Sequence, residues 1–158
     1  MINPNEVWAL LADARRGRLL RCTETGKGRV RVEERDSITN IWPGHEHQRS
    51  SPLWKNATIT FGIEQSDKED LRRFAREVAA WLQHKTEEFG IRRLHILVSG
   101  RFLGALRKVR TARLAAQLGP ERKADLTHLS SGKLAKHPVI RQLVASARPA
   151  GSGSRRDE

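Results

Sequence analysis

Leu94–Ser131 reads LHILVSGRFLGALRKVRTARLAAQLGPERKADLTHLSS and holds the clearest succession of elements in the chain. The apolar run 94–98 predicts a buried strand, and Ser99-Gly100 predicts a turn. A basic helix follows over 101–118, which Gly119-Pro120 ends. A strand over 124–129 and a short helix from Ser130 or Ser131 complete the stretch. A strand that leads through glycine into a helix leaves backbone N–H groups pointing outward, where an anion can bind.

Three further strands are predicted upstream, at 7–12, 18–22 and 29–34, with a hairpin loop over 23–27. Residues 36–66 form a long loop that includes a short strand at 58–61. A helix begins at Ser66 or Asp67 and ends at Gly90, with one apolar stripe at helical spacing. A last helix covers 139–147.

This order predicts a single α/β domain over residues 1–147. Its sheet is mixed, with five to six strands, and helices flank it. The first three strands pair antiparallel, and the later ones are parallel because helices connect them. Residues 148–158 are rich in Gly, Ser and Arg and predict a disordered basic tail.

Positive charge is concentrated in the second half of the chain. Residues 1–90 hold 15 basic and 14 acidic side chains, whereas residues 91–158 hold 15 basic and 4 acidic ones. Such an asymmetry favours a polyanionic partner, and RNA or a ribosome surface fits best. The alternative is a biased codon usage that yields basic surfaces without a partner.

The chain has one cysteine, Cys22, so it can form neither an internal disulfide nor a thiolate metal site. The first residues lack the pattern of a signal peptide, and no apolar run is long enough to span a membrane. We therefore expect a cytoplasmic protein without a metal or small-molecule cofactor. The sequence leaves its oligomeric state open.

Four segments together resemble the bacterial host attachment protein family, "protein required for attachment to host cells". They are LLAD with GRLL (10–13 and 17–20), FAREV (74–78), RFLGALR (101–107) and DLTHLS (125–130). The resemblance covers about residues 6–137. It implies a relation to the middle domain of eukaryotic and archaeal peptide-chain release factors, with a ribonuclease-H-like sheet.

The release-factor relation draws attention to the loop 36–66. In release factors the matching loop carries Gly-Gly-Gln, which places a water for ester hydrolysis. Here the loop reads PGHEHQ over 43–48, so Gly44 stands alone, four residues before Gln48. Adjacent glycines permit backbone conformations that other residues avoid. The resemblance thus favours a catalytically silent relative that still contacts ribosome or tRNA.

Two groups of residues are predicted to contact nucleic acid. Phosphate contacts are expected around the turn at 99–101 and along the helix after it, from Ser99, Gly100, Arg101, Arg107, Lys108, Arg110, Arg113 and Lys123. Loop contacts are expected from Trp42, His45, His47, Gln48, Arg49 and Trp54, with the two tryptophans as stacking candidates. For each group the alternative is an ordinary solvated surface.

Catalysis is the alternative function. Asp13 and Asp125 each end a predicted strand, and His128 follows Asp125 by three residues, where it could act as a general base. With a metal, such carboxylates cleave phosphodiesters, but the further acids needed are available only as Glu64, Asp67 or Asp70. The competing interpretation makes Asp13 a turn cap and gives Asp125 a structural role.

His45-Glu46-His47 has the spacing of a metal site, but we expect no metal there.

The leading hypothesis, based on the charge asymmetry, is a non-catalytic domain that binds RNA, tRNA or the ribosome. The alternatives are a metal-dependent phosphodiesterase or ester hydrolase, and a protein-interaction module that acts indirectly in attachment.

Overall fold

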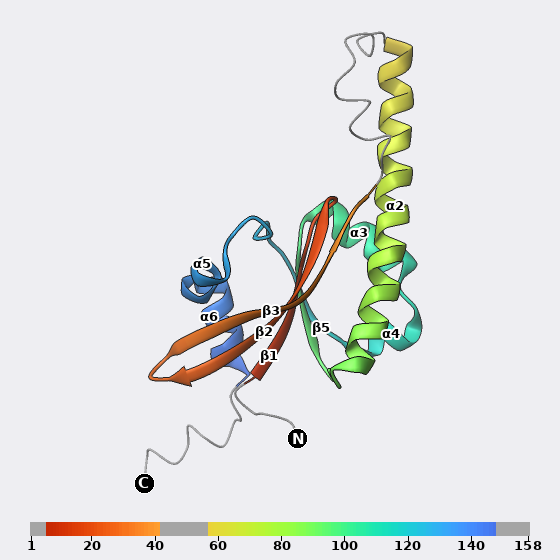
Figure 1. Cartoon of the computed structure of the whole chain (residues 1–158). Coiled ribbons are helices and arrows are strands. Elements are labelled where there is room, and N and C mark those ends of the chain that lie inside the picture. Colours follow the sequence, from red (N-terminus) through yellow and green to blue (C-terminus); the bar gives the residue numbers. More distant parts are fainter. Residues whose placement is uncertain (1–5, 42–56, 148–158) are drawn as a thin grey trace.

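A mixed five-stranded sheet forms the centre of the fold, in the order β3-β2-β1-β4-β5 (Figure 1). The structure, a computed structural model, describes residues 6–41 and 57–147, without the side chains of 57–66. The strands are β1 (Glu6–Ala12), β2 (Arg16–Gly26), β3 (Arg29–Thr39), β4 (Leu94–Val98) and β5 (Leu118–Lys123). β1, β2 and β3 pair antiparallel, whereas β1, β4 and β5 are parallel. This confirms the predicted α/β class and the change of strand direction.

Helices cover both faces of the sheet (Figure 1). One face packs against α2 (Ala57–Glu88), α3 (Gly100–Val109) and α4 (Ala112–Gln117), and the other against α5 (Ser131–Lys136) and α6 (Pro138–Ser146). Leu10 of β1 lies in the first core, and its neighbours Ala9 and Leu11 lie in the second. A strand buried on both faces has no polar side, which explains why 7–12 is apolar throughout.

The β2–β3 hairpin is longer than the sequence predicts. Its turn is Lys27-Gly28, with φ of 53° and 77°, and the strands continue to both sides of it. Two consecutive positive φ angles form the mirror-image turn whose twist suits a hairpin. The predicted loop over 23–27 was therefore wrong, because β2 continues to Gly26 and only two residues form the turn.

α2 begins at Ala57, about ten residues before the predicted start at Ser66 or Asp67. The short strand expected at 58–61 was also wrong, because this segment is helical. Its β-branched and aromatic residues favour strands, but such propensity is weak, and no proline interrupts the segment 57–88. Figure 1 shows the N-terminal part of α2 extending beyond the sheet. The expected loop 36–66 loses residues 36–39 to β3 and 57–66 to α2.

The predicted helix 101–118 is broken in two. Arg110 and Thr111 are both extended, and the Thr111 hydroxyl accepts a hydrogen bond from the Leu114 backbone N–H at 3.1 Å, which caps α4. Gly119-Pro120 does not end a helix but lies inside β5. β5 is an edge strand, where a proline without an N–H is tolerated.

Residues 124–129 were predicted as the last strand, and this was wrong. The sheet ends where the Ala124 N–H donates to the Val98 carbonyl at 2.9 Å, and the chain then turns, with a bond from Leu129 N–H to Leu126 carbonyl at 3.1 Å. Leu126 is buried, and its carbonyl accepts the bond from the residue three positions later, which is the pattern of a turn. A strand residue would instead bond to a neighbouring strand. The two C-terminal helices are confirmed, and the Ser130 side chain caps α5. In the described part of the chain, no helix has the length and apolar character needed to cross a membrane.

Candidate functional site

The parallel strands β1, β4 and β5 end together at one edge of the sheet. Ala12 pairs with Val98, and Val98 pairs with Lys123. Asp13 and Ser99 therefore leave the sheet side by side, and the Ser99 N–H donates to the Ala12 carbonyl at 3.1 Å. In open α/β sheets the carboxyl ends of the strands are the usual place for a ligand. We call this region, which consists of residues 13–15, 99–101 and Lys123, the carboxyl edge.

Arg18 of β2 holds the turn after β5 against this edge. Its Nη1 donates to the carbonyl of Thr127 at 3.0 Å and to that of Leu129 at 2.6 Å, and its Nε pairs with Glu34 of β3. Arg18 is only 9% exposed, so its hydrogen bonds are largely shielded from competition by water. The sequence offered one signal for this role, a charged residue inside an otherwise buried strand.

Asp13 caps the turn that follows β1. Its Oδ1 accepts hydrogen bonds from the backbone N–H groups of Arg15 at 2.8 Å and Arg16 at 3.0 Å, and its Oδ2 accepts from the Thr127 hydroxyl at 2.7 Å. Both carboxylate oxygens are thus engaged by the protein. This is the role that the competing interpretation expected. The segments GRLL and DLTHLS, which carry the family resemblance, therefore meet in one structural unit.

Asp125 and His128 lie on the exposed side of the same turn. The His128 Nδ1 is 3.9 Å from Asp125 Oδ1, and the two side chains are 61% and 73% exposed. The structure thus brings Asp13 to Thr127 and leaves the His128–Asp125 pair in solvent. In the described residues, no group of three or more His, Cys, Asp or Glu side chains could hold a metal ion.

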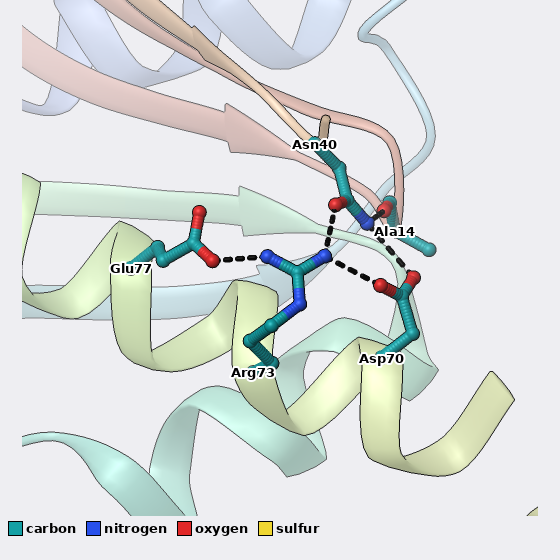
Figure 2. A network of polar contacts seen from close by, with 5 residues as sticks. All are labelled: Ala14, Asn40, Asp70, Arg73 and Glu77. Carbon is teal, nitrogen blue, oxygen red and sulfur yellow. Dashed lines mark hydrogen bonds and ion pairs between the residues drawn. The ribbon is translucent and has the colours of Figure 1, made fainter. Parts of the chain in front are cut away.

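A second polar network, which sequence reasoning missed, supports the turn from the opposite side. The Asn40 amide donates to the Ala14 carbonyl at 3.0 Å and to Asp70 Oδ2 at 2.9 Å. Figure 2 shows Arg73 of α2 between Asn40, Asp70 and Glu77, bonded to all three. Asp70, one of the acids considered for a metal site, is 7% exposed and serves instead to join α2 to the turn.

The turn at Ser99-Gly100 exists as predicted and begins α3. Ser99 is extended and makes no side-chain cap bond. The Lys123 side chain passes over Gly100, where an added Cβ would lie 3.6 Å from its Cδ. Arg101 and Lys123 are exposed, and neither forms an ion pair in the described part of the chain. The predicted phosphate-binding turn therefore has two available cations beside it.

Three of the predicted arginines have acidic partners instead. Arg107 and Arg110 both contact Glu121, each with an N–O distance of 2.6 Å, and Arg113 contacts Glu87 at 2.8 Å. Burial alone would raise the pKa of Glu121, but the hydrogen bonds from the two arginines outweigh it and lower this pKa. Lys108 is exposed and has no such partner in the same described region. Three arginines thus share two carboxylates, so the positive charge of α3 and α4 is reduced locally but not cancelled.

The predicted loop contacts all lie outside the described residues, at Trp42, His45, His47, Gln48, Arg49 and Trp54. Cys22 is described and is fully buried in the core under α5 and α6. Burial raises the pKa of its thiol to about 12. The thiol therefore stays protonated and serves as an apolar side chain.

His95 of β4 is expected to make the protein less stable in mild acid. It is 8% exposed, and its buried Nδ1 has no hydrogen-bond partner in the described structure. Burial, together with the charge of Arg93, lowers the pKa of the imidazole. Because an unfolded histidine titrates near about 6.5, the unfolded state binds more protons below that pH, and the free energy of unfolding falls as the pH is lowered.

Urea unfolding at pH 7 and pH 5 would measure this decline. His95→Leu should flatten it, whereas His84→Gln, at a side chain that is 74% exposed, should leave it unchanged. An equal decline in His95→Leu and in the unmodified chain would contradict the prediction.

Comparison with known proteins adds one finding to this geometry. A search of curated proteins returned no match. The family model described as "Protein required for attachment to host cells" matches residues 8–137. The matched range runs from β1 to the end of α5 and includes Asp13, Arg18 and Thr127. The chain is therefore a member of the host attachment family.

Proposed function

We propose that this host attachment family protein is a non-catalytic cytoplasmic RNA-binding domain, with the ribosome or tRNA as its partner. The observation that carries the proposal is the set of exposed, unpaired cations at the carboxyl edge. Arg15 follows β1, Arg101 lies in the first turn of α3, and Lys123 ends β5. None of the three has a carboxylate within ion-pair distance in the described structure. Exposed cations without partners are those that contribute most to binding a phosphate backbone.

The backbone geometry supports the same surface. The turn that carries Arg15 is held by Asp13 and Asn40, with a bond from the Asn40 N–H to the Arg15 carbonyl at 2.8 Å. Lys123 is fixed by its pairing with Val98. Cations on a rigid frame lose less conformational entropy when they bind than cations on mobile loops. We therefore assign the main contact to the carboxyl edge and a secondary one to Lys108 and the paired Arg107, Arg110 and Arg113.

The relation to release-factor middle domains, with a ribonuclease-H-like sheet, is part of this proposal. It is supported by the residues that resemble the family and by a sheet that changes from antiparallel to parallel pairing. The absence of Gly-Gly-Gln from the sequence favours contact with the ribosome without peptide release.

Sedimentation of the tagged protein with ribosomes through sucrose gradients at low salt tests this function. We expect co-sedimentation that weakens steeply with salt. Arg101→Gln with Lys123→Gln should reduce the slope of log affinity against log salt by roughly 0.7 to 0.9 per cation removed. Both residues are exposed, so the fold should persist.

Arg92→Gln with Arg93→Gln provides a control of equal charge. Both arginines are exposed and precede β4, at the opposite end of the strands from Arg101. This variant should leave the salt slope unchanged. Absence from every ribosomal fraction, or an equal loss in both variants, would refute the proposed surface.

A further inference from the structure

A polar cavity of about 420 Å³ lies between β2, β3 and the turn that Arg18 holds. Arg16 and Arg18 of β2 line one side, Ser37 and Thr39 of β3 another, and His128 and Ser130 close the third. The volume is within the range of small-ligand sites, roughly 300 to 1,000 Å³. We propose that this cavity binds a phosphate monoester, such as a sugar phosphate or a nucleoside monophosphate.

The lining of the cavity offers free guanidinium donors. Arg18 uses Nε and Nη1 for Glu34 and two backbone carbonyls, and its Nη2 has no hydrogen-bond partner in the described residues. Arg16 is exposed and has no ion pair there. Two guanidinium groups that keep free N–H donors can bind phosphate oxygens in a bidentate manner.

The hydroxyl groups of the lining add further hydrogen-bond donors. Ser37 and Thr39 project from the same side of β3, two residues apart, and each hydroxyl can donate to a ligand. The Ser130 hydroxyl oxygen accepts from the Lys133 N–H at 3.3 Å, which leaves its own hydrogen free to donate. The one lining carboxylate, Glu34, is already paired with Arg18. A ligand rich in acceptors and negatively charged matches this lining.

The turn beside the cavity is held in place before any ligand arrives. Arg18 binds the carbonyls of Thr127 and Leu129, and the Thr127 hydroxyl binds Asp13. The backbone that carries His128 and Ser130 is thus fixed on both sides. Preorganisation of this kind raises affinity because little order is lost on binding. The site does not depend on the proposed RNA contact, since neither Arg101 nor Lys123 lines the cavity.

Titration of the whole chain with inorganic phosphate, followed by NMR amide shifts and calorimetry, tests the proposal. We expect saturable binding with a dissociation constant of about 1 mM or tighter, and shifts confined to residues 16–18, 37–39 and 127–130. Arg16→Gln should weaken it about tenfold, because it removes one charge-assisted hydrogen bond. Thr39→Val offers a second, independent variant, and Arg92→Gln should bind as the unmodified chain does.

Titration with ribose 5-phosphate and with adenosine monophosphate shows whether the cavity recognises more of the ligand than its phosphate group. Tighter binding of the nucleotide than of the sugar phosphate assigns the cavity to nucleotides, and equal binding assigns it to the phosphate group alone. No saturable binding of any of the three, or an equal loss in Arg16→Gln and Arg92→Gln, overturns the proposal. Ribosome sedimentation of Arg16→Gln separates the two hypotheses. If this variant loses phosphate binding but sediments normally with ribosomes, the cavity binds phosphate independently of the RNA contact.

Discussion

Replacing Arg18 with methionine is expected to lower the free energy of unfolding by about 3 kcal/mol. Methionine keeps the apolar stem but leaves the carbonyls of Thr127 and Leu129 without their donor and Glu34 without its partner. A buried acceptor without a partner costs about 1 to 3 kcal/mol, and hydrogen bonds to charged groups are the stronger ones. The midpoint of thermal unfolding should fall by roughly 10 °C.

The same strand supplies a control for this prediction. Arg21 makes a single bond to Glu33 at 3.1 Å, and its side chain is 34% exposed, against 11% for Arg18. Arg21→Met should therefore cost less than about 1 kcal/mol. Arg18→Lys keeps the charge, but a single ammonium group cannot replace the guanidinium contacts with Glu34, Thr127 and Leu129 together. It should therefore recover only part of the lost stability.

Hydrogen exchange shows where the Arg18→Met protein has changed. We expect faster exchange of the amides in 127–136, because Arg18 ties this turn and the start of α5 to the sheet. Unchanged exchange there, or equal destabilisation by Arg21→Met, would show that Arg18 does not hold the turn.

Replacing Phe74 with alanine should be still more costly, at about 3 to 5 kcal/mol. Phe74 of α2 is fully buried, and its ring meets Phe102 of α3 edge to face, with centroids 5.9 Å apart. Truncation removes this contact and leaves a cavity between two helices and the sheet. The loss should also disturb the proposed RNA contact, because Phe102 is adjacent to Arg101 in the first turn of α3.

Urea unfolding monitored by circular dichroism measures this loss. Phe74→Leu keeps most of the volume and should cost clearly less than Phe74→Ala. Arg76→Ala changes an exposed residue two positions along the same helix and should stay within about 0.5 kcal/mol of the unmodified chain. A Phe74→Ala protein as stable as Arg76→Ala would mean that the α2–α3 contact contributes little to the core.

Local pattern was a reliable guide where burial is uniform. The strand 94–98 was predicted with its observed bounds, and the stripe through Phe74, Val78 and Leu82 correctly indicated a buried helix face. It was a poor guide at element ends. The start of α2 was placed about ten residues too late, and the break at Arg110 depends on the Thr111 cap. The path of 124–129 depends on where the pairing of β5 with β4 ends, at the bond from Ala124 to Val98. Strand propensity at 58–61 was overridden by the longer helix, as weak propensities commonly are.

The candidate site divides in the same way. The sequence predicted eight phosphate contacts, and four of them, Ser99, Gly100, Arg101 and Lys123, lie together at the carboxyl edge. It did not indicate that Glu121 pairs with Arg107 and Arg110, or that Asp13 bonds to Thr127 rather than to a metal. Asn40 and Arg73 had no pattern of their own, because a polar residue after a strand or on a helix face is common in any protein.

By itself the sequence determined the α/β class, the buried strands β1 and β4, the single cysteine and the excess of positive charge in the second half. These properties follow from periodicity and composition, which act within a few residues along the chain. Only the tertiary structure decided which charges are neutralised and which stay available. Ion pairs and buried hydrogen bonds form between residues as far apart as Asp13 and Thr127, and only the order of strands in the sheet brings such residues together.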